Sequence, residues 1–251
     1  LGTIGCGVVE GITVICLSKD RPDYFARLAE SLPDQFPVVE KILIQNGTDQ
    51  ETVDIAMEHG WTVITPGKNL SFSDGNNLAA KGAIGTHLLL VNNDVIMDPG
   101  CIDALWKHRA LPLLGCKIVT TKNQLVHAGC GFRHSDMMPV HIQAGIDPEN
   151  VVKSLYCPWV TFACVMARKD AWDALGGLSS EYFYSFEDVD YCLRQVEAFG
   201  QMPLMVYDAK ITHNFGGTRD MNELDPKNGK IFFDKWVRTK RLQDALGILF
   251  Q

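Results

Sequence analysis

The chain has 251 residues, of which 46% are hydrophobic, so it can bury a full core as one large domain or two small ones. Its formal net charge of −7 argues against a general nucleic-acid binder, although a local basic patch stays compatible with it. No stretch approaches the ~18 apolar residues that span a bilayer, and no charged-then-apolar leader is recognisable. We therefore expect a cytoplasmic chain.

Of the eight cysteines, Cys16, Cys164 and Cys192 lie inside apolar periodic segments, and no Cys-x-x-Cys pair occurs. This pattern favours buried, reduced thiols over disulfides and makes a zinc site an unfavoured interpretation. The chain starts at Leu1 instead of Met, which suggests an excised domain or a processed chain. Residues 249–251 could be a protease-tag remnant.

The first 65 residues alternate between strand and helix patterns. Strands are predicted at 12–17, 41–45 and 61–65, and amphipathic helices at 24–32 and 51–59. This alternation predicts a parallel sheet with right-handed crossovers. A polar, Gly-containing segment, 69–77, then opens a helix at 78–84. Its backbone N–H groups could face an anion, or Ser73 or Asp74 could simply cap the helix.

The apolar strand pattern at 86–91 stops at Asn92, Asn93 and Asp94. A buried strand that ends in a carboxylate delivers it to the carboxyl edge of the sheet, where open α/β folds bind ligands. Asp94 is therefore a candidate ligand for a hard cation such as Mg²⁺ or Mn²⁺. From this segment alone, a plain turn of the chain is an equally good interpretation.

Beyond Asp94 the alternation is less regular. We predict a helix near 102–108, a strand at 115–121, a long loop at 133–154 that could cover a site, a buried strand at 159–167 and a short helix at 169–175. His127, His134 and His141 lie in or beside the loop, and we assign none of them a role, because such histidines are more often surface or core residues than ligands.

Two acidic residues open the next predicted helix. Glu187 and Asp188 fall on its first turn, after a run of aromatic residues. They could stabilise the helix dipole, or one could be a general base at the rim of a pocket; local sequence slightly favours the first interpretation. Two short strands, 204–207 and 210–212, then lead to His213, which could ligate a metal or contact a diphosphate.

The last predicted helix, about 229–249, is basic in an acidic protein. Its cationic residues and the one before it are Lys227, Lys230, Lys235, Arg238, Lys240 and Arg241. Such a run is usually a solvated face. It could also dock on an anionic surface such as lipid headgroups at the inner face of the membrane.

Together, eight segments in this order resemble the family 2 glycosyltransferases of the GT-A fold, in particular the rhamnosyltransferase-like group that builds bacterial surface glycans. The resemblance runs from about Ile12 to Arg219 and rests on ITVICLSKDR, ILIQNGTDQET, NLSFSDGNN, LLLVNNDVIMDPG, VHAGCGF, WVTFACVMARKDAWDALGG, YFYSFEDVDYCLR and ITHNFGG.

The resemblance implies an α/β, Rossmann-like GT-A fold: a mostly parallel central sheet flanked by helices, a small antiparallel acceptor-side sheet and a C-terminal helix. It implies one domain over residues 1–251. Within it, 12–95 would bind the nucleotide, 96–220 would hold the metal and acceptor, and 221–251 would form the basic helix.

The resemblance also implies roles for individual residues. Asp94, in the place of the family's Asp-x-Asp motif, and His213 would hold Mn²⁺ or Mg²⁺ on the donor's diphosphate. Asp188 of the Glu187-Asp188 motif would be the catalytic base. The donor would further contact Leu17, Ser18, Asp20, Arg21, Gln45, Asn46, Asn69, Ser73, Asn76, Asn92 and Asn93. The sequence departs from the family's pattern at two positions. Gln45 stands where the family often has Asp, which could alter the contact to the nucleobase. Phe162 stands where the family commonly has Gly, which could narrow the acceptor side of the site.

These roles match the chemistry of sugar transfer from a nucleotide-sugar. A divalent cation stabilises the charge that builds on the leaving diphosphate, and a carboxylate takes the proton of the attacking hydroxyl. One base gives inversion, and we find no second nucleophile for a retaining reaction. We expect a UDP- or dTDP-sugar donor, with dTDP-rhamnose suggested by likeness alone, and a glycan, lipid-linked or other hydroxyl acceptor; modified nucleic acid is an unlikely acceptor that stays open.

Two other functions remain in view. A nucleotidyltransferase would need a Gly-rich, basic loop after the first strand, which LSKDRPD lacks. A catalytically silent binding or scaffold domain is disfavoured because Asp94, Asp188 and His213 are all present.

Overall fold

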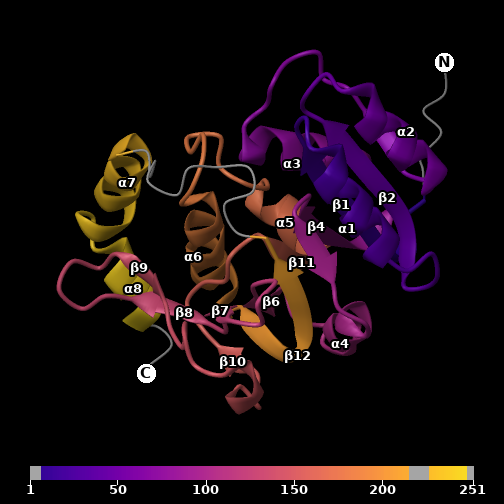
Figure 1. Cartoon of the computed structure of the whole chain (residues 1–251). Helices are drawn as coiled ribbons and strands as arrows, with labels where there is room; N and C mark the ends of the chain where they lie inside the picture. Colours follow the sequence, from indigo (N-terminus) through magenta and orange to yellow (C-terminus); the bar gives the residue numbers. More distant parts are fainter. Residues whose placement is uncertain (1–6, 215–225, 248–251) are drawn as a thin grey trace.

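A ten-stranded sheet forms the centre of the computed structural model, which describes residues 7–214 and 226–247 (Figure 1). Six of its strands run in one direction, and β11 (Cys164–Arg168) lies antiparallel between β4 and β6. The six are β3 (Thr62–Ile64), β2 (Val38–Gln45), β1 (Val9–Ser18), β4 (Gly85–Asn92), β6 (Leu113–Val119) and β12 (Leu204–His213). The predicted α/β fold with a mostly parallel sheet is confirmed.

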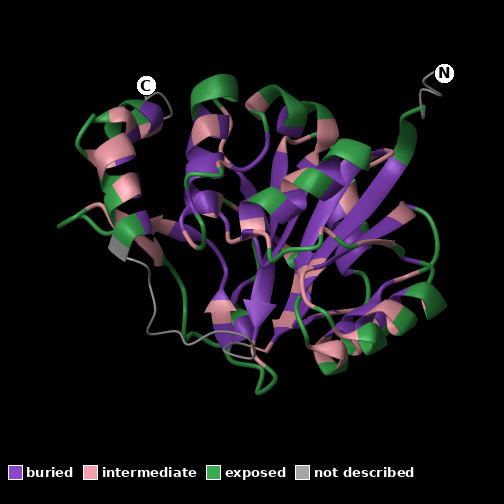
Figure 2. Ribbon diagram, turned by 90° about the horizontal axis from the view of Figure 1, so that it is seen from above, coloured by how far each residue is buried: buried purple, intermediate pink, exposed green. Residues whose placement is uncertain are grey.

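Helices cover both faces of this sheet, because the strands are apolar on both sides. Along β4, Leu88 and Leu90 enter one hydrophobic cluster while Leu89 and Val91 enter the other. The first cluster is covered by α3 (Phe72–Gly82), α5 (Lys169–Leu175) and α6 (Glu187–Phe199), and the second by α1 (Pro22–Ser31), α2 (Gln50–Glu58) and α4 (Cys101–Lys107). Figure 2 shows the buried strands between helices whose outer faces are exposed.

Short strands complete the second half of the chain. β5 (Val95–Met97) and β10 (Leu155–Tyr156) pair with β12, and β7 (Leu125–His127) pairs with β6. β8 (Cys130–Phe132) and β9 (Pro139–His141) form the predicted small antiparallel sheet. The predicted long loop at 133–154 also contains β9 and the 3₁₀ helix η1 (Pro148–Asn150), both too short to leave a periodic pattern.

Three other predicted boundaries are corrected by the structure. α3 starts six residues earlier than predicted, because the Ser71 hydroxyl caps it by accepting a 3.0 Å hydrogen bond from the Asp74 N–H. The apolar run at 159–167 becomes a strand only at Cys164, since Trp159 and Phe162 are buried outside the sheet ladder. The two strands predicted at 204–212 are one strand, β12, with an irregular register in the middle.

The predicted single helix at 229–249 is also wrong within the described residues. It consists of α7 (Pro226–Phe232), a π-helical turn η2 (Phe233–Val237) and α8 (Arg241–Gly247). Lys240 adopts φ +63°, a left-handed conformation that a continuous helix does not accept. Phe232, Trp236 and Leu242 are buried against the core, so tertiary packing and not helix propensity sets this path.

The basic residues of this segment are mostly paired within the chain. Asp234 pairs with Lys230 and Arg238, and Arg241 pairs with Glu197 at 2.6 Å. Lys235 reaches the buried carboxylate of Asp190. Docking of this segment on an anionic surface stays a prediction. Among the residues that the structure describes, no helix is long and apolar enough to cross a membrane.

Candidate active site

A cleft, here called the edge cleft, opens at the carboxyl ends of β1, β2 and β4. These ends meet because Leu17 is paired with Asn92 across one ladder and Ser18 with Gln45 across the other. Parallel strands present such an edge to ligands. The cleft is lined by Leu17, Ser18, Lys19, Asn46, Asn69, Leu70, Phe72, Asn92, Asn93, Asp94, Phe183 and Tyr184.

The two predicted metal ligands face each other beside this cleft. His213 ends β12, whose antiparallel pairing with β5 brings it opposite Val95, and so next to Asp94. His213 Nε2 lies 2.8 Å from Asp94 Oδ1, and both side chains are buried. The Asn214 N–H holds the loop by donating to the Asp94 carbonyl at 3.0 Å. The Gly216-Gly217 loop expected after His213 lies outside the described residues.

This pair fits a divalent cation. Metal–ligand bonds of about 2.1 Å at right angles place neighbouring ligand atoms about 3 Å apart, close to the distance between these two. The carboxylate oxygen is a donor that suits Mn²⁺ and Mg²⁺ alike.

Polar side chains predicted to contact the donor also hold the loops of the cleft together. The Asn93 amide donates to Ser18 Oγ at 3.0 Å in a buried contact between β4 and β1. The Asn46 amide donates to the Leu70 carbonyl at 2.9 Å and accepts from the Leu70 N–H at 2.8 Å. The segment before α3 is thereby fixed against the end of β2.

A glycine in α3 makes room for the wall of the edge cleft. A Cβ added to Gly75 would lie 2.4 Å from Leu17 Cδ2, so the helix can approach β1 this closely only without a side chain there. Gly82, at the end of the same helix, has no heavy atom within 4 Å of such a Cβ.

The remaining predicted donor contacts do not line the edge cleft. Asp20 accepts hydrogen bonds from the N–H groups of Thr48 and Asp49, and Arg21 pairs with Asp23 at 2.8 Å. Gln45 is buried and donates to Asp49. The other two, Ser73 and Asn76, are buried within α3.

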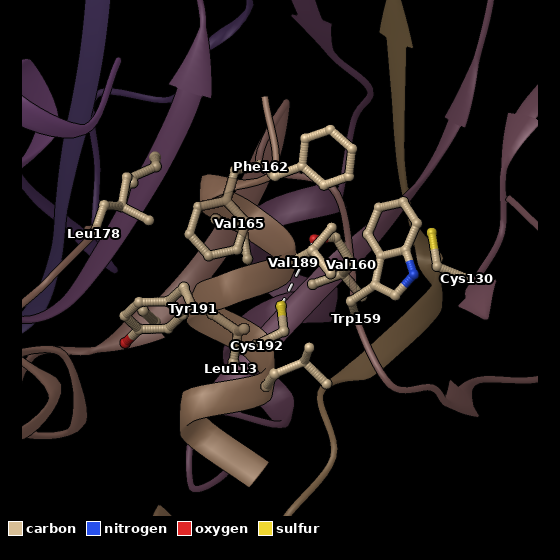
Figure 3. Packing of buried hydrophobic residues seen from close by; sticks show 14 of the residues in the cluster. Leu113, Cys130, Trp159, Val160, Phe162, Val165, Leu178, Val189, Tyr191 and Cys192 are labelled. Atoms are coloured by element: carbon tan, nitrogen blue, oxygen red, sulfur yellow. Dashed lines mark hydrogen bonds between the residues drawn. The ribbon is translucent and has the colours of Figure 1, made fainter. Parts of the chain in front are cut away.

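A second cleft, here called the Asp188 cleft, adjoins the first. The two share Phe72, Asn92 and Tyr184 as lining residues. The rest of its lining is Met138, Pro139, His141, Trp159, Thr161, Phe162, Ala163, Ser185, Phe186, Glu187, Asp188 and Val189. Phe162 is 2% exposed, and its ring meets the ring of Tyr191 of α6 edge-on (Figure 3).

The pKa of Asp188 suits a base working near neutral pH. Its half-buried carboxylate has a pKa raised from 3.8 to about 6, because burial disfavours the charged form. Hydrogen bonds from backbone N–H groups, including that of Val189 at 2.8 Å, oppose this rise without cancelling it. Glu187 beside it is buried and also lines the cleft.

The turn that presents Glu187 and Asp188 is held by α7. Ser185 and Phe186 have φ +75° and +70°, an unfavourable conformation for residues with a side chain. The Asn228 amide donates to the carbonyl of Tyr184, and the ring of Phe186 stacks on Phe232 at 5.2 Å. Sequence reasoning missed this role of α7, for which the only signal was the run of aromatic residues before Glu187.

Asp190 is an internal anchor and is fully buried. Its Oδ1 accepts from Trp236 Nε1 at 2.8 Å and lies 2.9 Å from Lys235 Nζ. Its Oδ2 accepts from Arg194 Nε at 2.8 Å. The third acid of the Glu-Asp-Val-Asp run thus ties α6 to the C-terminal segment.

The arrangement of the sheet and its helices is that of the GT-A fold. Over residues 13–110 the sequence matches the family model described as glycosyl transferase family 2. It is 27% identical over 232 residues to the O-antigen biosynthesis protein RfbC of Myxococcus xanthus, covering 83% of this chain but only 18% of that relative.

Two solved structures share the fold. The structure of GalNAc-T7 with UDP, GalNAc and Mn²⁺ has a TM-score of 0.71 at 12% identity, covering 91% of this chain and 49% of the other. The mannosyltransferase PcManGT from Pyrobaculum calidifontis, in complex with GDP-Man and Mn²⁺, has a TM-score of 0.60 at 13% identity, covering 84% and 60%. Residues 13–110 thus match the glycosyl transferase family 2 model, and the chain shares its fold with both structures.

Proposed function

We propose that the chain is a metal-dependent, inverting glycosyltransferase that moves a sugar from a nucleoside-diphosphate sugar to an acceptor hydroxyl. The observation that carries this proposal is the adjacency of the two clefts. One has the Asp94–His213 pair beside it, the other contains Asp188, and Asn92 lines both. A donor in the first cleft would therefore present its sugar toward the second.

In this proposal the edge cleft binds the nucleotide. Leu17, Ser18 and Asn46 offer apolar and hydrogen-bonding contacts to the nucleoside, and Asn92 and Asn93 lie beside the ribose and diphosphate. Asp94 and His213 would hold Mn²⁺ or Mg²⁺, which when bound supplies Lewis-acid stabilisation of the leaving diphosphate. The GalNAc-T7 and PcManGT structures contain Mn²⁺ with UDP or GDP-Man, which supports this assignment by fold.

Asp188 is the proposed general base. It would accept the proton of the acceptor hydroxyl as that oxygen attacks the anomeric carbon, a contribution of ~10²–10⁴ to the rate. A single base on the face opposite the leaving group gives inversion. Its raised pKa, about 6, keeps it ionised at pH 7 yet basic enough to take a proton.

For the donor we retain UDP- and dTDP-sugars, with rhamnose as one sugar to test. The name of the Myxococcus xanthus relative, an O-antigen biosynthesis protein, favours a glycan or lipid-linked acceptor over other hydroxyls. Phe72 and Tyr184 line the Asp188 cleft with partly exposed rings, which suit the apolar face of a sugar ring.

The direct test is release of nucleoside diphosphate from a panel of nucleotide-sugars with Mn²⁺, with and without acceptor glycans. Asp94→Asn is expected to abolish release. The matched control is Asp98→Asn: Asp98 lies four residues away and pairs with Lys210 of β12 at 2.8 Å. Release that is unchanged in Asp94→Asn, or absent in the wild type with every donor that binds, would favour a silent binding domain.

Asp188→Asn tests the base, with Glu181→Gln as its control in the same segment. Glu181 is exposed and pairs with Lys235 at 3.1 Å. We expect the first variant to lose transfer and the second to keep it. Full transfer by Asp188→Asn would contradict the assignment.

A further inference from the structure

Three side chains from the second half of the chain converge at the open end of the small sheet. His127 ends β7, Cys130 begins β8 and His141 ends β9. Cys130 and His141 are register partners across the β8–β9 ladder, and His127 precedes Cys130 by three residues. The thiol and the imidazole of His127 are buried, and that of His141 is exposed on one side.

The distances between their ligand atoms match those around a tetrahedral metal ion. His127 Nδ1 lies 3.1 Å from His141 Nδ1, and Cys130 Sγ lies 3.3 Å from the first and 3.5 Å from the second. Zn–N bonds of about 2.0–2.1 Å and Zn–S bonds of about 2.3 Å at tetrahedral angles put two nitrogens about 3.3 Å apart, and nitrogen and sulfur about 3.5 Å apart. All three separations agree within ~0.3 Å.

We propose that His127, Cys130 and His141 form a metal site that takes a borderline-soft divalent ion of the Zn²⁺ type and leaves one coordination position open. The donor set decides the class of ion: a thiolate with two imidazoles selects Zn²⁺ or Co²⁺, whereas Mn²⁺ and Mg²⁺ prefer oxygen. This site is separate from the Asp94–His213 pair and does not depend on the proposed function.

The protonation states are compatible with binding. Burial lowers the pKa of His127 to about 3 and also lowers the pKa of His141, so both imidazoles are neutral at pH 7 and can ligate. Burial raises the pKa of the Cys130 thiol, so the thiol carries its proton in the metal-free chain, and formation of a Zn–S bond would release that proton to solvent. The neighbouring thiol of Cys157 donates to the Trp159 carbonyl at 3.1 Å and is not one of the three ligands.

An ion at this position would fasten one wall of the Asp188 cleft. Met138, Pro139 and His141 of the hairpin line that cleft. The ring of His141 packs edge-on against Trp159, whose Nε1 donates to the Gly131 carbonyl in β8. Figure 3 shows Trp159 beside Cys130. The ion would clip β7, β8 and β9 together, and its open position would accept water or an external ligand.

The test uses the full chain, stripped with a chelator and titrated with Co²⁺ or Zn²⁺ alone. We expect one Co²⁺ per chain, with the visible bands of tetrahedral Co²⁺ and a near-ultraviolet thiolate-to-Co²⁺ charge-transfer band. Zn²⁺ should displace it and raise the melting temperature. Cys130→Ser should abolish the charge-transfer band and weaken Zn²⁺ binding by more than ~10²-fold, since even an outer-shell partner costs 10–100-fold.

Matched variants test whether the ion binds at these three residues and not at other thiols, at other histidines or in the edge cleft. Cys157→Ser, His134→Ala and Asp94→Asn should keep the charge-transfer band. His141→Ala, at an exposed residue that can change without unfolding the chain, should lose tetrahedral binding. A wild-type spectrum without a thiolate band, or equal Zn²⁺ affinity in His141→Ala and the wild type, would overturn the proposal and leave a hydrogen-bonded cluster.

Discussion

The indole Nε1 of Trp236 donates a 2.8 Å hydrogen bond to the buried carboxylate of Asp190, joining the C-terminal segment to the helix that carries Asp188. The two residues are 46 positions apart. The Asp190 carboxylate also forms ion pairs with Lys235 and Arg194. The C-terminal segment is thereby part of the support of the candidate active site.

Breaking this support should destabilise the chain. We expect Asp190→Ala to lower the free energy of unfolding by about 2–3 kcal/mol, because it leaves the partly buried Arg194 and Lys235 and the buried Trp236 N–H without their acceptor. Trp236→Phe removes this hydrogen bond and part of a fully buried ring system, and should cost at least ~1–2 kcal/mol. Denaturant unfolding measures both. Asp234→Asn, on the surface of the same segment, serves as the control and should change little; equal effects for Asp190→Ala and Asp234→Asn would contradict this account.

Asp188→Asn should stabilise the protein at neutral pH while it removes transfer. The folded-state pKa of about 6 exceeds the ordinary 3.8, so the native state binds the proton more tightly than the unfolded state. Stability therefore falls as the pH rises from about 4 to about 6, by up to ~3 kcal/mol for a shift of about two units. The asparagine variant avoids this cost. Unfolding curves at pH 4 and pH 7.5 should show its advantage only at the higher pH.

The pH dependence of transfer should report the same group. If Asp188 is the base, kcat/KM falls tenfold per pH unit below about pH 6, as the carboxylate becomes protonated in the free enzyme. Initial rates between pH 4.5 and 8, with the fold checked at each pH, measure this limb. A rate that stays level down to pH 4.5 would assign the proton transfer elsewhere.

Gly75→Ala should weaken donor binding. The added methyl group would meet Leu17 at 2.4 Å and push that side chain into the edge cleft. We expect the KM for the donor to rise severalfold with a smaller change in kcat. Gly82→Ala, in the same helix with open space around it, should leave KM unchanged and stabilise the helix by up to ~1 kcal/mol. Identical kinetics for the two variants would show that Leu17 does not line the donor site.

The parts of the fold predicted from sequence are those with long, strongly periodic patterns. β1, β4 and α5 lie where their apolar patterns indicate, and α6 begins at Glu187 as its stripe of Val189, Cys192, Leu193 and Val196 requires. Elements governed by distant contacts left no periodic pattern in their own sequence. α7 and α8 follow the burial of Phe232 and Trp236, and β9 exists because it pairs with β8.

The candidate site likewise contains residues that the sequence predicted and residues that it did not. The resemblance suggested that Asp94 and His213 act together, and the structure brings them within 2.8 Å because Asp94 lies in the turn before β5 and His213 ends β12, the strand that pairs with β5. The assignment of Asp20 and Gln45 to the donor remains a prediction, since their hydrogen bonds hold the loop before α2. The His127–Cys130–His141 cluster was passed over because a search for Cys-x-x-Cys does not detect His-x-x-Cys joined to a histidine across a strand pair.

The central claim, that Asp94 and His213 hold a cation against a nucleoside diphosphate, is tested most directly by calorimetric titration of UDP, dTDP and GDP into the full chain. Each titration is run in Mn²⁺ and in chelator, for the wild type, Asp94→Asn and Asp98→Asn. We predict that Mn²⁺ tightens binding of at least one nucleotide by about tenfold or more, ~1.4 kcal/mol, in the wild type and Asp98→Asn but not in Asp94→Asn. Equal affinity with and without Mn²⁺ in the wild type, or a gain preserved in Asp94→Asn, would contradict it.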